Sequence, residues 1–158
     1  MATIVVEDGS GLTNSNSYAS EAELTTYATD RGVTLTGTTS VLLIQAMDFI
    51  EAQDFKGNKG SESQALQWPR DYVVIDGYYV DGDEIPTLLK QAQMETCIGI
   101  DGGVNPLANV PRETKKEKVD VLEVEYMDGA RSQTYLQAVH TKLRKLLKNN
   151  GALKVIRV

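Results

Sequence analysis

The sequence predicts a mostly α-helical protein of about four helices with one small β-hairpin or strand element. Three observations lead to this prediction: apolar residues recur at helical spacing in several stretches, a capping-box motif precedes the first of them, and an Asp-Gly pair separates two β-prone runs. The chain of 158 residues, 41% hydrophobic and 24% charged, has the size and composition of one globular domain. We expect a single domain over 1–148 and an extended C-terminal tail over 149–158.

The N-terminal part predicts a short strand, a loop and a first helix. Thr3–Glu7 is β-prone and is followed by a loop rich in glycine, serine and asparagine. Ser20 and Glu23 have capping-box spacing, in which each side chain accepts a hydrogen bond from the other residue's free backbone N–H. The first helix therefore begins after Ser20, and Gly32 stands where its C-terminal end is expected.

The second helix is predicted from Ser40, as its N-cap, to about Phe55. Its expected inner face is Leu43, Ala46, Met47, Ile50 and Ala52, and its expected outer face is Gln45, Asp48, Glu51 and Gln53. The polar, glycine-containing segment Lys56–Ser63 that follows predicts a mobile loop.

A hairpin and a third helix come next. Val73–Ile75 and Tyr78–Val80 flank Asp76-Gly77, and a tight hairpin turn needs positive φ at both central residues. Pro86 then opens a helix at its first position, where no backbone donor is lost. Leu88, Leu89, Ala92 and Cys97 form the apolar side of this helix.

The C-terminal part predicts one strand, a fourth helix and a β-prone tail. Alternation of apolar and charged residues from Lys118 to Tyr126 predicts a strand, although Leu122 interrupts the period. Apolar residues at helical spacing predict a helix over Gln133–Lys148, with Asn150-Gly151 as its stop. The tail beyond has no obvious strand partner.

Charge is divided sharply along the chain. Residues 129–158 contain seven Lys or Arg and no acid, whereas residues 1–101 contain sixteen acids and five basic residues. The basic residues expected to contact a partner from the fourth helix are Lys142, Arg144, Lys145 and Lys148. Such a helix suits nucleic acid or an acidic protein surface. The net charge of −6 and the absence of aromatic residues after Tyr135 argue against a free nucleic-acid binder.

Candidate catalytic and metal sites are weak. Gly9-Ser10-Gly11 lacks the third glycine of a nucleotide loop and predicts a surface loop. Asp81-Gly82-Asp83, near Asp76 and Glu84, resembles the start of a calcium loop with a misplaced glycine and no closing glutamate, so a solvated acidic loop is expected. The only histidine, His140, and the only cysteine, Cys97, are too few for a structural zinc site. We expect no enzymatic activity, no cofactor and no metal.

Trp68-Pro69-Arg70 has two interpretations. Trp68 could stack on a base while Arg70 binds phosphate. We favour the structural interpretation, in which Trp68 anchors the preceding loop to the core and Arg70 makes an ion pair.

Several motifs together resemble a family of tailed-phage structural proteins. They are the opening stretch Ile4–Ser20, Phe55-Lys56-Gly57, Gln64–Arg70, Asp76-Gly77, Ile85-Pro86 and Glu113–Tyr126. The order and spacing of these motifs over nearly the whole chain resemble the head–tail connector, or adaptor, family, whose members are often described as DnaT-like single-stranded DNA-binding proteins. The resemblance implies a small helical bundle with a hairpin or strand segment and an extended C-terminal tail.

The resemblance implies a structural virion protein in the phage neck, assembled in the host cytoplasm. Its partners would be the portal protein, further copies of itself in a ring, usually a dodecamer, and a downstream connector or tail protein. Double-stranded DNA would be present only as channel content, and no membrane is expected. The portal-docking residues would be Leu153, Lys154, Val155, Ile156, Arg157 and Val158. The alternative is a DnaT-like single-stranded DNA-binding protein acting in replication, and a third hypothesis is a small enzyme with an acidic site near Asp76–Glu84.

Overall fold

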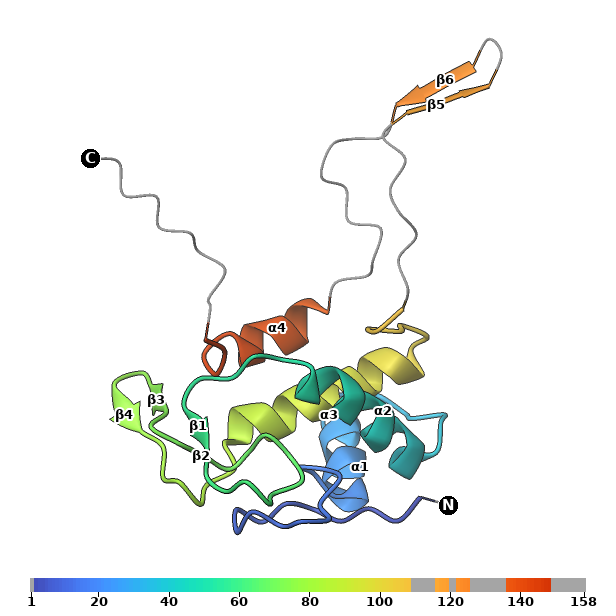
Figure 1. The fold of residues 1–158 in the computed structure, drawn as a ribbon. Helices are drawn as coiled ribbons and strands as arrows, with labels where there is room; N and C mark the ends of the chain where they lie inside the picture. Colours follow the sequence, from blue (N-terminus) through green and yellow to red (C-terminus); the bar gives the residue numbers. More distant parts are fainter. Residues whose placement is uncertain (1, 109–115, 120–121, 126–135, 149–158) are drawn as a thin grey trace, which may run out of the picture.

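A computed structural model describes residues 2–108, 116–119, 122–125 and 136–148 (Figure 1). The helices are α1 (Glu21–Thr29), α2 (Thr39–Glu51), α3 (Thr87–Asp101) and α4 (Gln137–Leu143). The strands are β1 (Asn58–Lys59), β2 (Arg70–Asp71), β3 (Val74–Ile75), β4 (Tyr78–Tyr79), β5 (Lys116–Val119) and β6 (Leu122–Glu125), paired as β1–β2, β3–β4 and β5–β6. The prediction of about four helices together with small β elements is confirmed.

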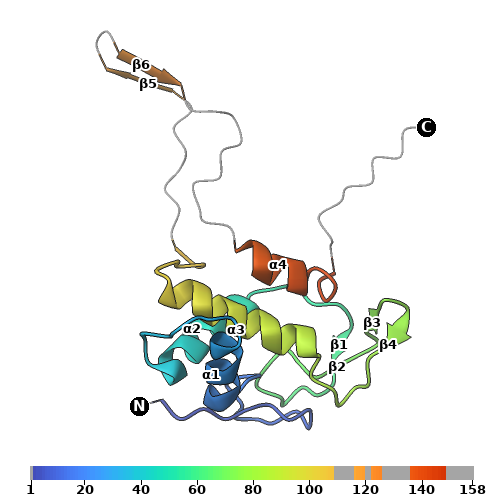
Figure 2. The same cartoon turned by 180° about the vertical axis from the view of Figure 1, so that it is seen from behind.

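Helix α3 is the centre of the helical part of the fold. Helices α1 and α2 pack against α3, and α4 lies along α3 on the side away from α1 (Figures 1 and 2). Two groups of buried side chains hold these helices together. One surrounds Trp68 and Phe55 and includes residues of α2, α3 and α4, and the other surrounds Leu24 and Cys97 between α1, α2 and α3. Within the described ranges, no helix is long and apolar enough to cross a membrane.

The first helix begins as the sequence predicts. The Ser20 hydroxyl accepts a hydrogen bond from the Glu23 backbone N–H at 3.2 Å, and the Glu23 carboxylate accepts one from the Ser20 N–H at 2.7 Å. The prediction that Ser40 caps α2 is wrong. Thr38 is the N-cap and makes no side-chain capping bond, while Ser40 lies buried in the first turn of the helix.

The C-terminal helix is shorter than predicted. Helix α4 ends at Leu143, and Arg144 is its C-cap. The residues that follow pair instead with the segment after α2: Lys56 N–H donates to Leu146 O at 2.9 Å, and Lys148 N–H donates to Asp54 O at 2.9 Å. This backbone pairing replaces the last helical turn. Residues 133–135 and the tail 149–158, with its docking residues, lie outside the described residues.

Two strand predictions are wrong in part. The N-terminal segment forms only an isolated bridge between Val6 and Ser17, not a strand over Thr3–Glu7. The strand predicted from Lys118 to Tyr126 is two strands, β5 and β6, which pair antiparallel. Leu122, which interrupts the alternating pattern, is the first residue of the second strand, so the irregularity marks the start of that strand.

The segment predicted to be a mobile loop is tied down. Strand β1 within it pairs with β2, and the buried Gln64 amide donates to Leu66 O and Pro69 O at 2.9 and 3.0 Å. The outward orientation predicted for Glu51 is also wrong. Its carboxylate accepts hydrogen bonds from the Tyr18 hydroxyl at 2.5 Å and the Gln67 N–H at 2.8 Å. Burial raises the pKa of Glu51 despite these hydrogen bonds.

Candidate functional site

The hairpin β3–β4 forms as the sequence predicts. Asp76 and Gly77 at the turn have φ of 52° and 91°, as a two-residue hairpin turn requires. Val74 pairs with Tyr79 and Ile75 with Tyr78. Val73, which is fully buried, anchors the hairpin to the core around Trp68.

Large apolar side chains on this hairpin face solvent. Tyr72 and Tyr78 are each 79% exposed and Tyr79 is 80% exposed, and Val74 beside them is 38% exposed. We call these exposed residues, Tyr72, Val74, Tyr78 and Tyr79, the tyrosine patch. In the hairpin register Val74 and Tyr79 lie on one face and Tyr78 lies on the other. Tyrosine supplies a large contact area with a polar tip at low entropic cost, so exposed tyrosines in a group are typical of a binding surface.

Tyr72 adopts a backbone conformation that a bulky residue rarely takes. Its φ is 60°, in the left-handed region. This conformation leaves Tyr72 exposed while the next residue, Val73, is fully buried. Residues held in such sparsely populated backbone conformations are common at binding sites.

Acidic residues flank the tyrosine patch in the sequence. Residues 71–84 contain five acids and no Lys or Arg. Asp76, Asp81, Asp83 and Glu84 are exposed, and we call these four the acidic rim. Lys145 Nζ lies 2.6 Å from the Asp76 carboxylate and so neutralises one of them. No group of three or more His, Cys, Asp or Glu side chains that could hold a metal occurs among the described residues.

The predicted basic contacts are mostly engaged within the chain. Lys142 Nζ lies 3.3 Å from Glu95, and Lys148 Nζ lies 3.1 Å from Asp54, in addition to the Lys145–Asp76 pair. These pairs join the C-terminal residues to acids of the first hundred residues. In the folded protein, basic residues of the C-terminal part are therefore paired with some of the acids that the sequence places far from them.

The Gly9-Ser10-Gly11 loop is already filled by a carboxylate. Glu7 is fully buried and accepts hydrogen bonds from Gly9 N–H at 3.1 Å, Gly11 N–H at 2.9 Å and Leu12 N–H at 3.0 Å. The Ser15 hydroxyl adds a fourth at 2.8 Å. Backbone donors that could cradle a phosphate are thus used internally, which removes the nucleotide-loop interpretation.

The Trp68-Pro69-Arg70 motif is structural. Trp68 is fully buried and its ring meets Phe55 edge-on at 6.0 Å, so it cannot stack on a base. Among the described residues Arg70 makes hydrogen bonds in place of the expected ion pair: its guanidinium donates to Lys56 O at 2.7 Å and Gly57 O at 2.8 Å. Arg70 therefore fixes the loop that β1 and β2 close.

The Cys97 side chain lacks the properties of a catalytic nucleophile. Cys97 is fully buried, and burial raises the pKa of its thiol to about 12. The His140 ring packs edge-on to Phe49 at 6.1 Å. A thiol that stays protonated in an apolar cluster is a packing residue.

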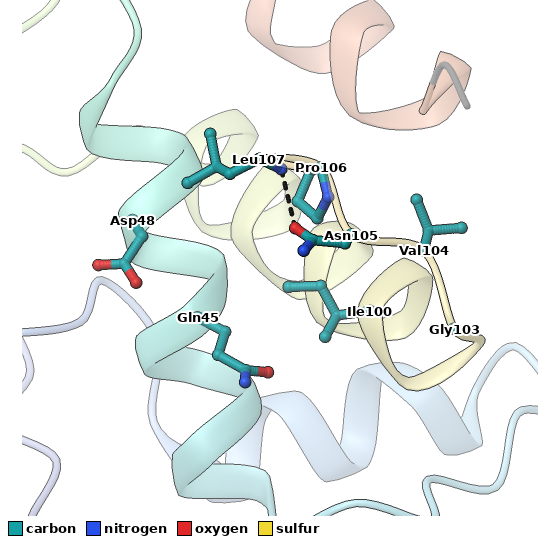
Figure 3. A pocket seen from close by; sticks show the side chains of 8 residues that line it. All are labelled: Gln45, Asp48, Ile100, Gly103, Val104, Asn105, Pro106 and Leu107. Carbon is teal, nitrogen blue, oxygen red and sulfur yellow. Dashed lines mark hydrogen bonds between the residues drawn. The ribbon is translucent and has the colours of Figure 1, made fainter. Parts of the chain in front are cut away.

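A surface pocket lies between α2 and the segment after α3, with a volume of about 370 Å³ (Figure 3). The residues that line it are Gln45, Asp48, Ile100, Gly103, Val104, Asn105, Pro106 and Leu107. Asp48 is the one ionisable residue of this lining. The pocket thus lacks a matched acid and base, which a catalytic site would need.

The tyrosine patch was not among the site residues predicted from the sequence. A usable pattern is nevertheless present, since three of the seven tyrosines fall within residues 72–79, around an Asp-Gly turn in a purely acidic segment. Aromatic residues at a hairpin could equally have been core residues. Only the burial of Val73 and the exposure of its neighbours separate these possibilities.

One family model matches the chain over residues 2–158, and it is described as "Putative DnaT-like ssDNA binding protein". No curated protein matches the chain significantly, and neither does any solved structure.

Proposed function

Because the chain belongs to the family of DnaT-like single-stranded DNA-binding proteins, we propose that it acts by binding and not by catalysis. Within that class we propose the role of a head-to-tail adaptor, a structural virion protein that forms a ring under the portal. The ring would link the capsid vertex to the tail or to the next connector protein around the DNA channel.

The tyrosine patch within its acidic rim is the observation that carries this proposal. Tyrosine-rich surfaces suit contact with other proteins. Nucleic acid bound at the tyrosine patch would bring its phosphates close to the carboxylates of the acidic rim. The negative charges of the two groups would repel each other. Three of the C-terminal lysines that could attract phosphate are held by acids of the same chain. Both observations favour a protein partner.

The partners in this role are the portal, neighbouring copies and a downstream connector or tail protein. Closure of a ring needs two different surfaces on each copy that complement each other. The portal contact is assigned to Leu153–Val158, assisted by Arg144 on the exposed side of the α4 terminus. Acids exposed toward a channel would let double-stranded DNA pass without binding, since both are negative.

Electron microscopy of the protein mixed with its portal tests the proposal. We expect a ring bound to one face of the portal. A matched variant that lacks Leu153–Val158 should keep the helical circular-dichroism spectrum and the unfolding midpoint of the full chain while it loses portal binding. Unchanged binding by this variant contradicts the assignment of the tail, and no binding by the full chain contradicts the adaptor role.

The second candidate function is single-stranded DNA binding in replication, which the description of the family favours. Titration of a labelled oligonucleotide at low and moderate salt separates it from the adaptor role. Tight binding with a steep salt dependence would replace our proposal, because phosphate contacts release counterions. We expect no binding even at low salt.

A further inference from the structure

Strand β4 presents an open edge. Among the described strands only β3 pairs with β4, and both views show this hairpin at the margin of the fold (Figures 1 and 2). Hydrogen-bonded and non-hydrogen-bonded pairs alternate along an antiparallel hairpin. The Val80 N–H donates to Val73 O at 3.0 Å, so the neighbouring pair, to which Tyr79 belongs, is a non-hydrogen-bonded one. The N–H and C=O of Tyr79 therefore point away from β3, where a further strand could pair with them.

Each face of the hairpin carries one exposed tyrosine. Tyr79 is 80% exposed and shares its face with Val74, whereas Tyr78 is 79% exposed and shares the other face with Ile75. A two-stranded hairpin is marginally stable alone in water. An added strand with apolar residues on both of its faces would therefore cover apolar area on both sides of the hairpin.

The last ten residues of the chain, 149–158, have this pattern. They lie outside the described residues, and their sequence is β-prone. In an extended chain, each face of the final six residues would hold two apolar side chains and one base: Leu153, Val155 and Arg157 on one face, and Lys154, Ile156 and Val158 on the other.

This tail begins beside the hairpin. Lys145 Nζ lies 2.6 Å from the carboxylate of Asp76, at the hairpin turn. Lys148, after which the tail begins, follows Lys145 by three positions, and Tyr79 follows Asp76 by three. Ten extended residues span about 33 Å, so the tail can reach β4 of its own chain.

Charge complementarity favours the tail as the occupant. Residues 71–84, which include the hairpin, contain five acids and no Lys or Arg, and residues 149–158 contain two basic residues and no acid. Opposite net charges on the two segments favour their contact. The hairpin of a second copy would instead oppose two acidic segments, so it is disfavoured at this edge.

We propose that Leu153–Val158 pairs as a third strand with the open edge of β4 in the same chain, as an extended peptide joins a sheet edge. The contact goes beyond the function proposed above and does not depend on it. In the adaptor role the same residues dock on the portal, so the hairpin would hold the tail until the portal displaces it.

Amide hydrogen exchange, followed by NMR on isotope-labelled protein, tests the contact. We expect the Tyr79 amide to exchange on the order of tenfold more slowly in the full chain than in a variant that lacks residues 149–158, because the third strand supplies its acceptor. The Val80 amide donates to Val73 O without the tail and should be protected in both chains, which shows that the hairpin stays folded. Equal exchange of the Tyr79 amide in the two chains would overturn the proposal.

A mixing experiment identifies the chain that supplies the tail. The isotope-labelled variant without residues 149–158 is mixed with the unlabelled full chain. We expect its Tyr79 amide to keep the fast exchange that it shows alone. Slower exchange in the mixture would show that the tail comes from another copy, and the assignment to the same chain would be wrong.

Charge reversal in the tail gives a second test without truncation. Lys154→Glu combined with Arg157→Glu should remove the protection of the Tyr79 amide, because the tail then has the same sign of charge as the hairpin. Lys154→Arg combined with Arg157→Lys is the matched control and should keep it. Retained protection in the charge-reversed variant would contradict the pairing.

The outcomes for the tail and for the adaptor role are separate. If the Tyr79 amide is protected by the tail but the full chain does not bind the portal, the adaptor role is wrong and the contact stands. If the full chain binds the portal but its tail leaves the exchange of the Tyr79 amide unchanged, the contact is wrong and the adaptor role stands.

Discussion

Removal of one hydroxyl group, by Tyr18→Phe, should destabilise the fold strongly. Tyr18 is fully buried, and its hydroxyl donates to the Glu51 carboxylate at 2.5 Å and accepts from the backbone N–H of Trp68 at 3.1 Å. Phenylalanine keeps the packing of the ring but leaves a partly buried carboxylate oxygen and a buried backbone N–H without this partner. The variant therefore isolates the hydrogen bonds from the packing.

The magnitude follows from these two contacts. A hydrogen bond to a charged group contributes about 1.5–3 kcal/mol, and an unsatisfied buried donor costs about 1–3 kcal/mol. Glu51 retains the hydrogen bond from Gln67 N–H at 2.8 Å, so the two contributions overlap in part. We expect the free energy of unfolding to fall by about 3 kcal/mol, which lowers the melting temperature by about 6–12 °C in a chain of this size.

Urea denaturation followed by circular dichroism measures this loss, with Tyr27→Phe as the matched control. Among the described residues the Tyr27 hydroxyl bonds to Glu95 alone, at 2.9 Å and in a partly buried position, and Glu95 keeps its contacts with Lys142 and Arg31. The control should cost about 1 kcal/mol or less. Equal losses in the two variants, or a loss below about 1 kcal/mol for Tyr18→Phe, would refute the role assigned to the Tyr18 hydroxyl.

Three further predictions follow. Glu7→Ala leaves three backbone donors and the Ser15 hydroxyl without their acceptor, and should lower the free energy of unfolding by about 3 kcal/mol, measured in urea against the exposed Glu62→Ala. Burial raises the pKa of Glu51 above its unfolded value, so the stability it contributes is full below the unfolded pKa and is lost as pH rises through the folded pKa. Melting temperatures between pH 4 and pH 8 should therefore fall, relative to Glu51→Gln, as pH increases, and parallel curves would contradict this. Tyr72→Gly replaces a residue with positive φ by one that adopts this conformation without strain, so the free energy of unfolding should stay unchanged or rise by about 1 kcal/mol. Sedimentation velocity should show weaker self-association of this variant. A loss of stability would mean that Tyr72 is a packing residue.

Local chemistry made several elements predictable from the sequence. The capping box of Ser20 and Glu23 and the turn at Asp76-Gly77 depend on neighbouring residues alone, and both form as predicted. The apolar face of α2 is likewise predictable, since Leu43, Ala46 and Ile50 recur at helical spacing and are fully buried. Such patterns need no knowledge of the rest of the fold.

Only the tertiary structure decided the features that depend on distant parts of the chain. Glu51 looks like an outer-face residue of a helix, but Tyr18 and Gln67 approach it from other segments and make it a partly buried acceptor. The end of α4 at Leu143 is also tertiary, because residues 54–56 pair with the backbone that follows the helix.

Some features of the candidate site are likewise predictable from the sequence, and others depend on the tertiary structure. The sequence by itself determined that a hairpin stands in an acidic segment, because turn chemistry and charge are local properties. Which of its side chains face solvent was decided by the anchoring of Val73 in the core around Trp68, which leaves the tyrosines outside. Pairing of Lys142, Lys145 and Lys148 with distant acids was also decided in three dimensions, since a charge pattern along the chain does not specify which charges meet.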